Sequence, residues 1–267
     1  MDPIVVSGYV GALFVGLVLG LIGAGGSILI LPILVYLLKI PPVLATAYSL
    51  FIVGLTALVG TYKYYKKDLV NLKTAGIFAL PAFFGVFLTR KFLVPAIPAE
   101  LFTAGTFTLT KDVFILLFFA VVMVLAAYTM IKGKKDVKEE QGEQVFNYPL
   151  IGLEGLIVGF VTGLVGAGGG FLIIPALVVL AKIPMKEAVG TSLLIIAAKS
   201  LFGFLGDIGG EYAIDWSFLG IFSSISIVGI FLGIYLNHYV PGQKLKKGFG
   251  FFVLAMGLFI IGKELFM

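Results

Sequence analysis

The sequence predicts an all-α polytopic membrane protein made of two inverted-topology repeats of about five helical segments each. Three observations support this fold class: the composition, a duplicated glycine-rich motif, and the charges of the loops. Of the 267 residues, 60% are hydrophobic and 12% are charged, whereas a soluble domain is about one half apolar and about one quarter charged. Most of the chain must therefore face lipid or other apolar helices.

The composition also excludes several classes of protein. No polar stretch is long enough to form a second, water-soluble core. The 19 lysine and arginine residues lie mostly in short loops, a pattern typical of topology-determining charge and not of nucleic-acid binding. The chain has no cysteine, which removes disulfides and thiolate metal sites. Because no nucleophile–base pair, phosphate loop or metal cluster occurs either, we expect no enzymatic activity, no metal and no cofactor.

Apolar runs predict ten helical segments, most of them long enough to cross a bilayer as a helix. They lie at about 4–22, 27–38, 43–62, 72–92, 112–131, 148–165, 170–181, 187–206, 216–237 and 248–266. The polar stretch 132–147 separates a first transmembrane repeat (1–131) from a second (148–267) and is predicted to be a cytoplasmic linker.

The two halves share a sequence. Between residues 20–50 and 163–193, about 18 of 31 positions are identical at a constant offset, well above the level that apolar composition alone gives. The match continues weakly beyond this stretch, with Gly76 against Gly220 and Gly85 against Gly229. A duplication explains both matches.

Loop charge predicts that the second copy is inverted. The loop after the third segment of the first half is rich in lysine, and its counterpart is acidic. The residues are Lys63, Lys66, Lys67 and Lys73 in the first loop and Asp207, Glu211 and Asp215 in the second. With the basic loop in the cytoplasm, each half has five segments and both termini are extracytoplasmic. The rival, four spans per half in a parallel repeat, places both loops on one side and ranks second.

Segments 27–38 and 170–181 are too short to cross a bilayer as helices. About twelve residues of helix measure roughly 18 Å, against roughly 30 Å of hydrocarbon. We expect each to be one arm of a helical hairpin whose glycine-rich tip lies near the bilayer centre. Paired breaks of this kind are the best sequence-level indication of a transporter's binding site. The alternative is that the glycines only permit close helix crossings.

The tips are the predicted substrate-binding residues. They are Gly23, Ala24, Gly25, Gly26 and Ser27 in the first half and Gly166, Ala167, Gly168, Gly169 and Gly170 in the second. Helices that begin at Ser27 and Gly170 would direct free N–H groups into the gap between the tips. Such N-termini favour an anion without any charged side chain.

Several polar side chains are further candidates. Lys199 is the one charge deep in an apolar segment, where an ammonium usually faces a cavity or a partner; it could neutralise an anion or take up a proton, or extend to the interface. Glu154 could pair with Lys199, relay a proton, or lie near the headgroups. Ser49, Thr191 and Ser192 could bind substrate oxygens or bond back to their own helices. His238 is expected at the surface.

The duplicated Gly-x-x-Gly-Ala-Gly-Gly break, the apolar run to Pro32 or Pro175, and the following Ala-x-x-x-Ser (Ala45 to Ser49, Ala188 to Ser192) resemble the sulfite exporter TauE/SafE family of membrane permeases. The resemblance covers nearly the whole chain. It implies a secondary transporter of small sulfur-containing anions such as sulfite, thiosulfate, sulfate or organosulfonates (sulfoacetate-like), in a cell inner membrane.

The sequence therefore favours an anion transporter that works by alternating access in a lipid bilayer, with no nucleic-acid partner. A homo-oligomer is compatible with it. A carrier of another small anion, a cation or a neutral solute is the main alternative, and it predicts transport that does not depend on Lys199. A non-transporting scaffold is disfavoured because no loop is long enough to hold a partner.

Overall fold

The computed structural model describes residues 3–104, 107–132, 148–179, 183–210, 212–237 and 242–266. Most of the predicted linker, together with Glu211 and His238, lies outside these residues. In the described part of the chain, seven helices are long and apolar enough to cross a membrane. This confirms the predicted polytopic all-α class.

Each half contains the same series of helices, and the predicted segments agree with them to within a few residues. The first half has α1 (Pro3–Ile22), a 3₁₀ helix (Ala24–Leu29), α2 (Ile30–Pro32), a π-helix (Ile33–Leu37), α3 (Pro42–Tyr65), α4 (Leu72–Leu88), a second π-helix (Thr89–Leu93), α5 (Val94–Ala96), strands β1 (Glu100–Ala104) and β2 (Phe107–Thr110), and α6 (Lys111–Lys132). The second half has α7 (Tyr148–Val165), α8 (Gly170–Val179), α9 (Met185–Leu205), α10 (Trp216–Leu236) and α11 (Gly242–Phe266).

Helices of each half pack against helices of the other half. Helix α1 packs against α10, and α7, the counterpart of α1, packs against α4, the counterpart of α10. Equivalent glycines make both crossings close. A Cβ on Gly16 would clash with the carbonyl oxygen of Ser226, and a Cβ on Gly159 would clash with that of Ala82. Small residues let helix backbones approach in this way, so the repeat is present in the packing as well as in the sequence.

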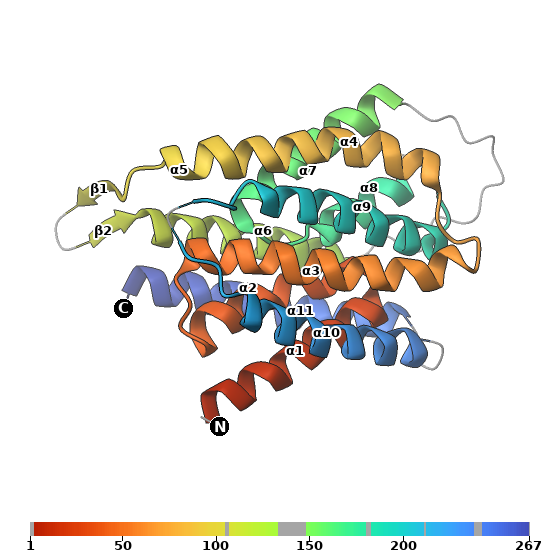
Figure 1. Ribbon diagram of the computed structural model, residues 1–267, viewed down its shortest axis with the longest axis horizontal. Coiled ribbons are helices and arrows are strands. Elements are labelled where there is room, and N and C mark those ends of the chain that lie inside the picture. Colours follow the sequence, from red (N-terminus) through yellow and green to blue (C-terminus); the bar gives the residue numbers. More distant parts are fainter. Residues whose placement is uncertain are drawn as a thin grey trace.

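Equivalent helices run in opposite directions (Figure 1). Helix α3 runs from left to right in this view and its counterpart α9 from right to left. The start of α1, the end of α11, the β1–β2 hairpin and the loop between α9 and α10 all lie at the left end, whereas the loop between α3 and α4 lies at the right. The lysine-rich loop and its acidic counterpart are thus at opposite ends of the molecule.

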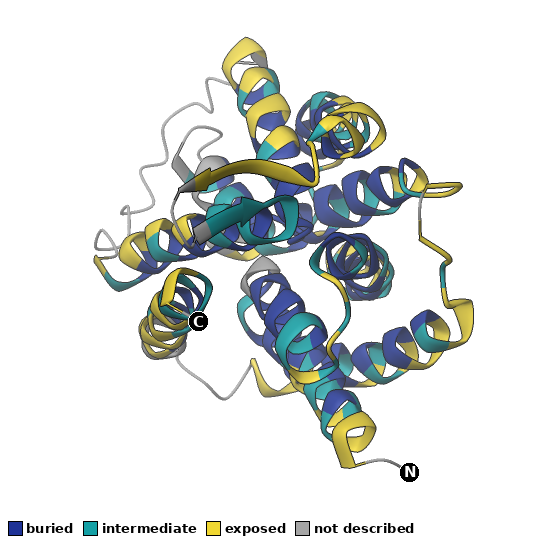
Figure 2. Cartoon of the chain, turned by 90° about the vertical axis from the view of Figure 1, so that its left-hand side faces the viewer, coloured by how far each residue is buried: buried dark blue, intermediate teal, exposed yellow. Residues whose placement is uncertain are grey.

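Exposed residues lie on the outer faces of the helices and buried residues face inward (Figure 2). Large apolar side chains dominate the outside, for example Phe84, Leu125 and Val228, which are 55%, 61% and 55% exposed. A water-soluble protein rarely exposes so much apolar surface. This surface is therefore the one that faces lipid.

The short hairpin β1–β2 was not predicted. Its strands pair antiparallel, from Glu100 opposite Thr110 to Ala104 opposite Phe107. Residues 97–110 separate α5 from α6. Pro98 lies just after the end of α5 and disfavours a continued helix, because proline lacks the N–H that a helix requires. The threonines that follow favour an extended backbone.

Candidate functional site

Both glycine-rich stretches break the helix that contains them. Gly23 and Gly166, at equivalent positions, have φ of 75° and 69°, a left-handed conformation that glycine adopts without strain. In the second half α8 begins at Gly170, as predicted. In the first half the prediction of a start at Ser27 is wrong: a 3₁₀ helix begins directly after Gly23, at Ala24. The tighter i→i+3 pattern takes the glycines themselves into the helix.

Each turn packs against a helix of the other half. A Cβ on Gly166 would clash with the backbone of Thr46, and a Cβ on Gly23 would lie 2.8 Å from Cγ1 of Val189. Thr46 and Val189 are equivalent, each the fifth residue of its helix. The turns therefore interlock reciprocally.

The two stretches touch near the centre. A Cβ on Gly168 would lie 3.2 Å from Cβ of Ser27 and 3.1 Å from Cγ2 of Ile196, and it would also meet Val53. Val53 and Ile196 lie near the midpoints of α3 and α9. Ser27 is fully buried. The contact between the two glycine-rich stretches is thus at mid-depth and closed to solvent.

The second turn presents backbone donors. The backbone–backbone hydrogen bonds described around it use the N–H groups of Gly166, Leu172 and Ile173, and none uses those of Gly168, Gly169 or Gly170. All three glycines are buried. A buried N–H without an acceptor costs about 1–3 kcal/mol. Three such groups in sequence at the start of a helix form a site suited to an anion.

Lys199 lies beside these donors. Its side chain is 0% exposed, and its Nζ donates to Thr162 Oγ1 at 2.8 Å. A Cβ on Gly169 would lie 3.3 Å from this Nζ. Within the described residues no ion pair joins Lys199 to Glu154 or to any other acid. The ammonium and the free N–H groups therefore form one positively polarised cluster inside the protein.

The predicted hydroxyls lie nearer the ends of the helices. Thr191 Oγ1 accepts a hydrogen bond from the backbone N–H of Asn71 at 2.9 Å, and Tyr48, at the equivalent position, accepts one from Asp215 N–H at 2.8 Å. Both bonds join the second or third turn of one helix to the N-cap of a helix in the other half.

The serines that follow differ from each other. Ser192 donates to the carbonyl of Val189 at 2.8 Å. It therefore bonds back to its own helix, which was the alternative to substrate binding. Ser49 Oγ is buried, and no described residue is its hydrogen-bond partner. Glu154 is partly buried on α7, eight residues before Thr162 and hence about 12 Å along the helix from it.

With this geometry in hand, comparison with known proteins identifies the family. The sequence profile of the family described as Sulfite exporter TauE/SafE matches residues 9–260. The chain belongs to this family. The assignment covers both glycine-rich turns and nearly every helix.

Similar proteins agree with the TauE/SafE assignment. A probable membrane transporter protein of Methanocaldococcus jannaschii is 30% identical over 264 residues, covering 92% of this chain and 91% of its own. Another, from Xylella fastidiosa (strain 9a5c), is 29% identical over 255 residues, with 94% and 92% covered. The probable membrane transporter protein YdhB of Bacillus subtilis is 26% identical, with 92% and 96% covered. No solved structure matches. These findings establish a membrane transporter and leave its cargo open.

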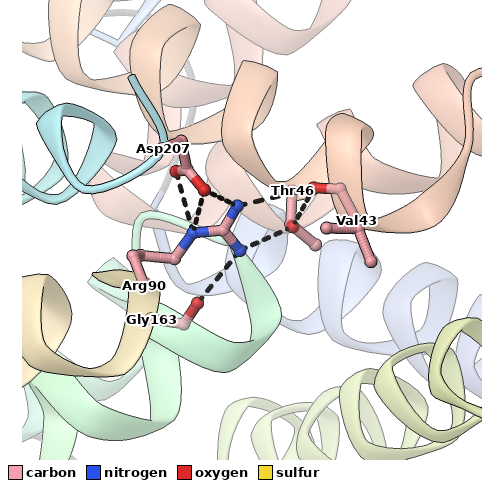
Figure 3. A network of polar contacts seen from close by, with 5 residues as sticks. All are labelled: Val43, Thr46, Arg90, Gly163 and Asp207. Atoms are coloured by element: carbon pink, nitrogen blue, oxygen red, sulfur yellow. Dashed lines mark hydrogen bonds and ion pairs between the residues drawn. The ribbon is translucent and has the colours of Figure 1, made fainter. Parts of the chain in front are cut away.

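The TauE/SafE chain has a second buried cation that the sequence analysis missed. The Arg90 side chain is 0% exposed, and that of Asp207, in the loop after α9, is 15% exposed. Arg90 Nε donates to both carboxylate oxygens of Asp207, at 2.9 and 2.8 Å (Figure 3). Burial raises the pKa of the Asp207 carboxyl, and the guanidinium of Arg90 opposes this rise.

Neutral acceptors complete the coordination of the guanidinium. Arg90 Nη1 donates to Thr46 Oγ1 at 2.8 Å and to the Gly163 carbonyl at 3.4 Å, and Nη2 donates to the Val43 carbonyl at 3.4 Å. The network joins residues of both halves (Figure 3). A signal was present, because Arg90 is the single arginine among 18 lysines. In the sequence alone, however, Arg90 resembles a loop charge, because Lys91 follows it at the end of an apolar segment.

Two cavities lie beside the starts of α3 and α6. One, of about 360 Å³, is lined by Tyr9, Tyr48 and Asp215 among others. The other, of about 340 Å³, is lined by Val43, Asp112 and Tyr212 among others. Val43 also takes part in the Arg90 network. The second cavity therefore adjoins the buried arginine.

Proposed function

We propose that this TauE/SafE protein carries a small sulfur-containing anion, such as sulfite, thiosulfate, sulfate or an organosulfonate, across the cytoplasmic membrane. The observation that carries the proposal is the cluster of free N–H groups at Gly168, Gly169 and Gly170 beside the ammonium of Lys199. All of these groups are donors. An oxyanion offers acceptors to the N–H groups and a counter-charge to the ammonium.

The charge of the cluster favours an anion over a cation. In the described residues the Lys199 ammonium has a hydroxyl partner and no carboxylate. A cation would meet this ammonium and the positive end of α8 in a buried region, where charges interact more strongly than in bulk water. An anion would instead be stabilised by both. Ser27, which is buried and packs against Gly168, would border the site in the first half.

Alternating access follows from the repeat. Equivalent helices run in opposite directions (Figure 1), and the turns interlock around the centre, which supports an inverted repeat with a binding site at the interface of the halves. The lysine-rich loop after α3 supports a cytoplasmic location for the right end of Figure 1 and an extracytoplasmic location for both termini. In the proposed cycle one half rocks against the other around the buried cluster.

The test is transport by purified protein in proteoliposomes. Radiolabelled sulfite, thiosulfate, sulfate and sulfoacetate would be compared with a labelled monovalent cation and a neutral solute of similar size. We expect flux above that of empty vesicles for at least one sulfur anion and none for the cation. Flux of the cation or the neutral solute alone would contradict the proposal.

A further inference from the structure

We propose that Arg90 is a second anion subsite, on the path between the extracytoplasmic surface and the central cluster, and that Asp207 holds it closed. The inference rests on the proposed function, since the anion in question is the transported one. In the closed state the fork of the guanidinium is filled by the Asp207 carboxylate. In the open state an oxyanion of the cargo takes the place of that carboxylate.

The guanidinium is held independently of Asp207. Thr46 Oγ1 and the carbonyls of Gly163 and Val43 accept hydrogen bonds from its two terminal nitrogens. These three bonds keep the fork in place when the carboxylate leaves. Carboxylates and sulfur oxyanions both present paired oxygens to such a fork, which a lysine does not match.

The two charges differ in their freedom to move. Arg90 is fully buried and lies in a membrane-spanning helix, whereas the side chain of Asp207 is 15% exposed and belongs to the loop between α9 and α10. Once its partner is gone, a buried guanidinium is costly. The departure of Asp207 therefore requires another anion at Arg90, and this couples opening to the presence of cargo.

The position fits an access path. Val43 lines the cavity of about 340 Å³ and its carbonyl accepts from Arg90. On the other side, Arg90 contacts Gly163, three residues before the turn at Gly166, and Thr46, on which Gly166 packs. The same cavity carries Lys111 and Asp112, whose charges offset each other. An anion that moves from the cavity towards the turn meets Arg90 first.

Among the described residues, the Arg90–Asp207 ion pair has no counterpart at the other end of the repeat. At the constant offsets of the repeat, the positions equivalent to Arg90 and Asp207 are Ile234 and Tyr64. Neither an isoleucine nor a tyrosine can form an ion pair of this kind at the other end of the repeat. The ion pair is thus an addition to the repeat, not a product of the duplication.

The single arginine makes the proposal directly testable. Phenylglyoxal modifies guanidinium groups, so its one arginine target in these 267 residues is Arg90. The adduct would be measured by peptide mass spectrometry in wild type, in Asp207→Asn and in Asp207→Glu. Methanesulfonate and sulfate are the probes, with chloride at equal ionic strength as the control. Sulfite is unsuitable because it consumes the reagent.

We expect slow modification of wild type and of Asp207→Glu, and modification several-fold faster in Asp207→Asn, slowed again by methanesulfonate or sulfate but not by chloride. Equal rates with and without the sulfur anions would overturn the inference. So would an Arg90 that never reacts in a correctly folded Asp207→Asn protein.

A second measurement does not depend on the folding of Asp207→Asn. Arg90→Lys keeps the charge and loses the fork, so we expect a several-fold rise in KM for the transported anion with a smaller change in kcat. An unchanged KM would count against the subsite. Because wild-type flux tests the transporter itself, transport without protection of Arg90 would refute this inference and leave the proposed function intact.

Discussion

The first glycine-rich turn packs against aliphatic residues, and the second packs against a lysine and a threonine. A Cβ on Gly26 would meet the backbone of Val18 and Leu19, whereas a Cβ on the equivalent Gly169 would meet Thr162 and Lys199. Leu19 and Thr162 occupy the same position of the repeat, as do Thr56 and Lys199.

Two substitutions therefore separate a neutral turn from a charged one. In the first half Thr56 Oγ1 donates to the carbonyl of Ile52, at 2.6 Å, and its hydrogen bond stays within the helix. In the second half the Thr162 hydroxyl accepts from Lys199. The comparison teaches that the duplication gave both halves a glycine-rich turn, and that later divergence placed a buried charge, Lys199, in the second half.

The largest effect is expected from removing that charge. Lys199→Met keeps the length of the side chain, and we expect anion flux in proteoliposomes to fall at least tenfold, about 1.4 kcal/mol, because the anion loses its counter-charge. Thermal unfolding in detergent should show equal or greater stability, since a buried ammonium is replaced by an apolar group. Normal flux would remove Lys199 from the site.

Moving the buried lysine from the second half to the first tests whether the two glycine-rich turns are equivalent. We expect the double variant Thr56→Lys/Lys199→Thr to remain inactive, although it restores the composition. Leu19 offers no hydroxyl to hold the new ammonium in place. Recovery of flux in this variant would mean that the two turns are interchangeable.

The next effect concerns the backbone of the turns. Gly166→Ala combines a left-handed φ with a clash against the Thr46 backbone, so we expect a loss of about 2–5 kcal/mol in unfolding free energy. Gly23→Ala has the same φ penalty but meets a Val189 side chain, and should lose about 1–2 kcal/mol. Melting temperatures in detergent would rank the two.

Gly76→Ala is the matched control for these variants. This glycine lies within α4, and a Cβ there would have nothing within 4 Å. We expect a small gain of about 0.5–1 kcal/mol. If Gly166→Ala lost no more stability than this control, the close packing of Gly166 on Thr46 would be contradicted.

The smallest effect tests the equivalent hydroxyls. Thr191→Val and Tyr48→Phe each remove the acceptor of a loop N–H, and each should cost about 1 kcal/mol in thermal unfolding. Because neither hydroxyl lies at the central cluster, we expect transport at saturating anion to be nearly unchanged. A rise in KM for either variant alone would place that hydroxyl on the path of the cargo.

Much of the fold could be predicted because apolar runs and a repeat are local properties of a sequence. The bounds of α3, α6 and α10 follow from such runs, and the breaks follow from consecutive glycines. The hairpin β1–β2 could not be predicted, since a few threonines and prolines near a membrane surface give no strong periodicity. The start of the 3₁₀ helix at Ala24 was also missed, because a 3₁₀ turn and a loop have similar glycine-rich sequences.

The candidate site was predictable in part for the same reason. Lys199 stood out as a charge within an apolar run. Its partner Thr162 did not, because a hydroxyl in an apolar helix is common and usually bonds to its own backbone. Arg90 was overlooked because it lies at the end of its segment, where a charge normally faces water.

By itself the sequence determined the class of protein, the family, the duplication and the places where the helices break, because each depends on composition or on self-similarity along the chain. The tertiary structure alone decided which groups meet. It brought Gly168 against Ser27, Lys199 against Thr162 and Arg90 against Asp207, pairs that are far apart in the chain. Such contacts depend on how the two halves interlock, and a local sequence pattern does not show which distant residues meet.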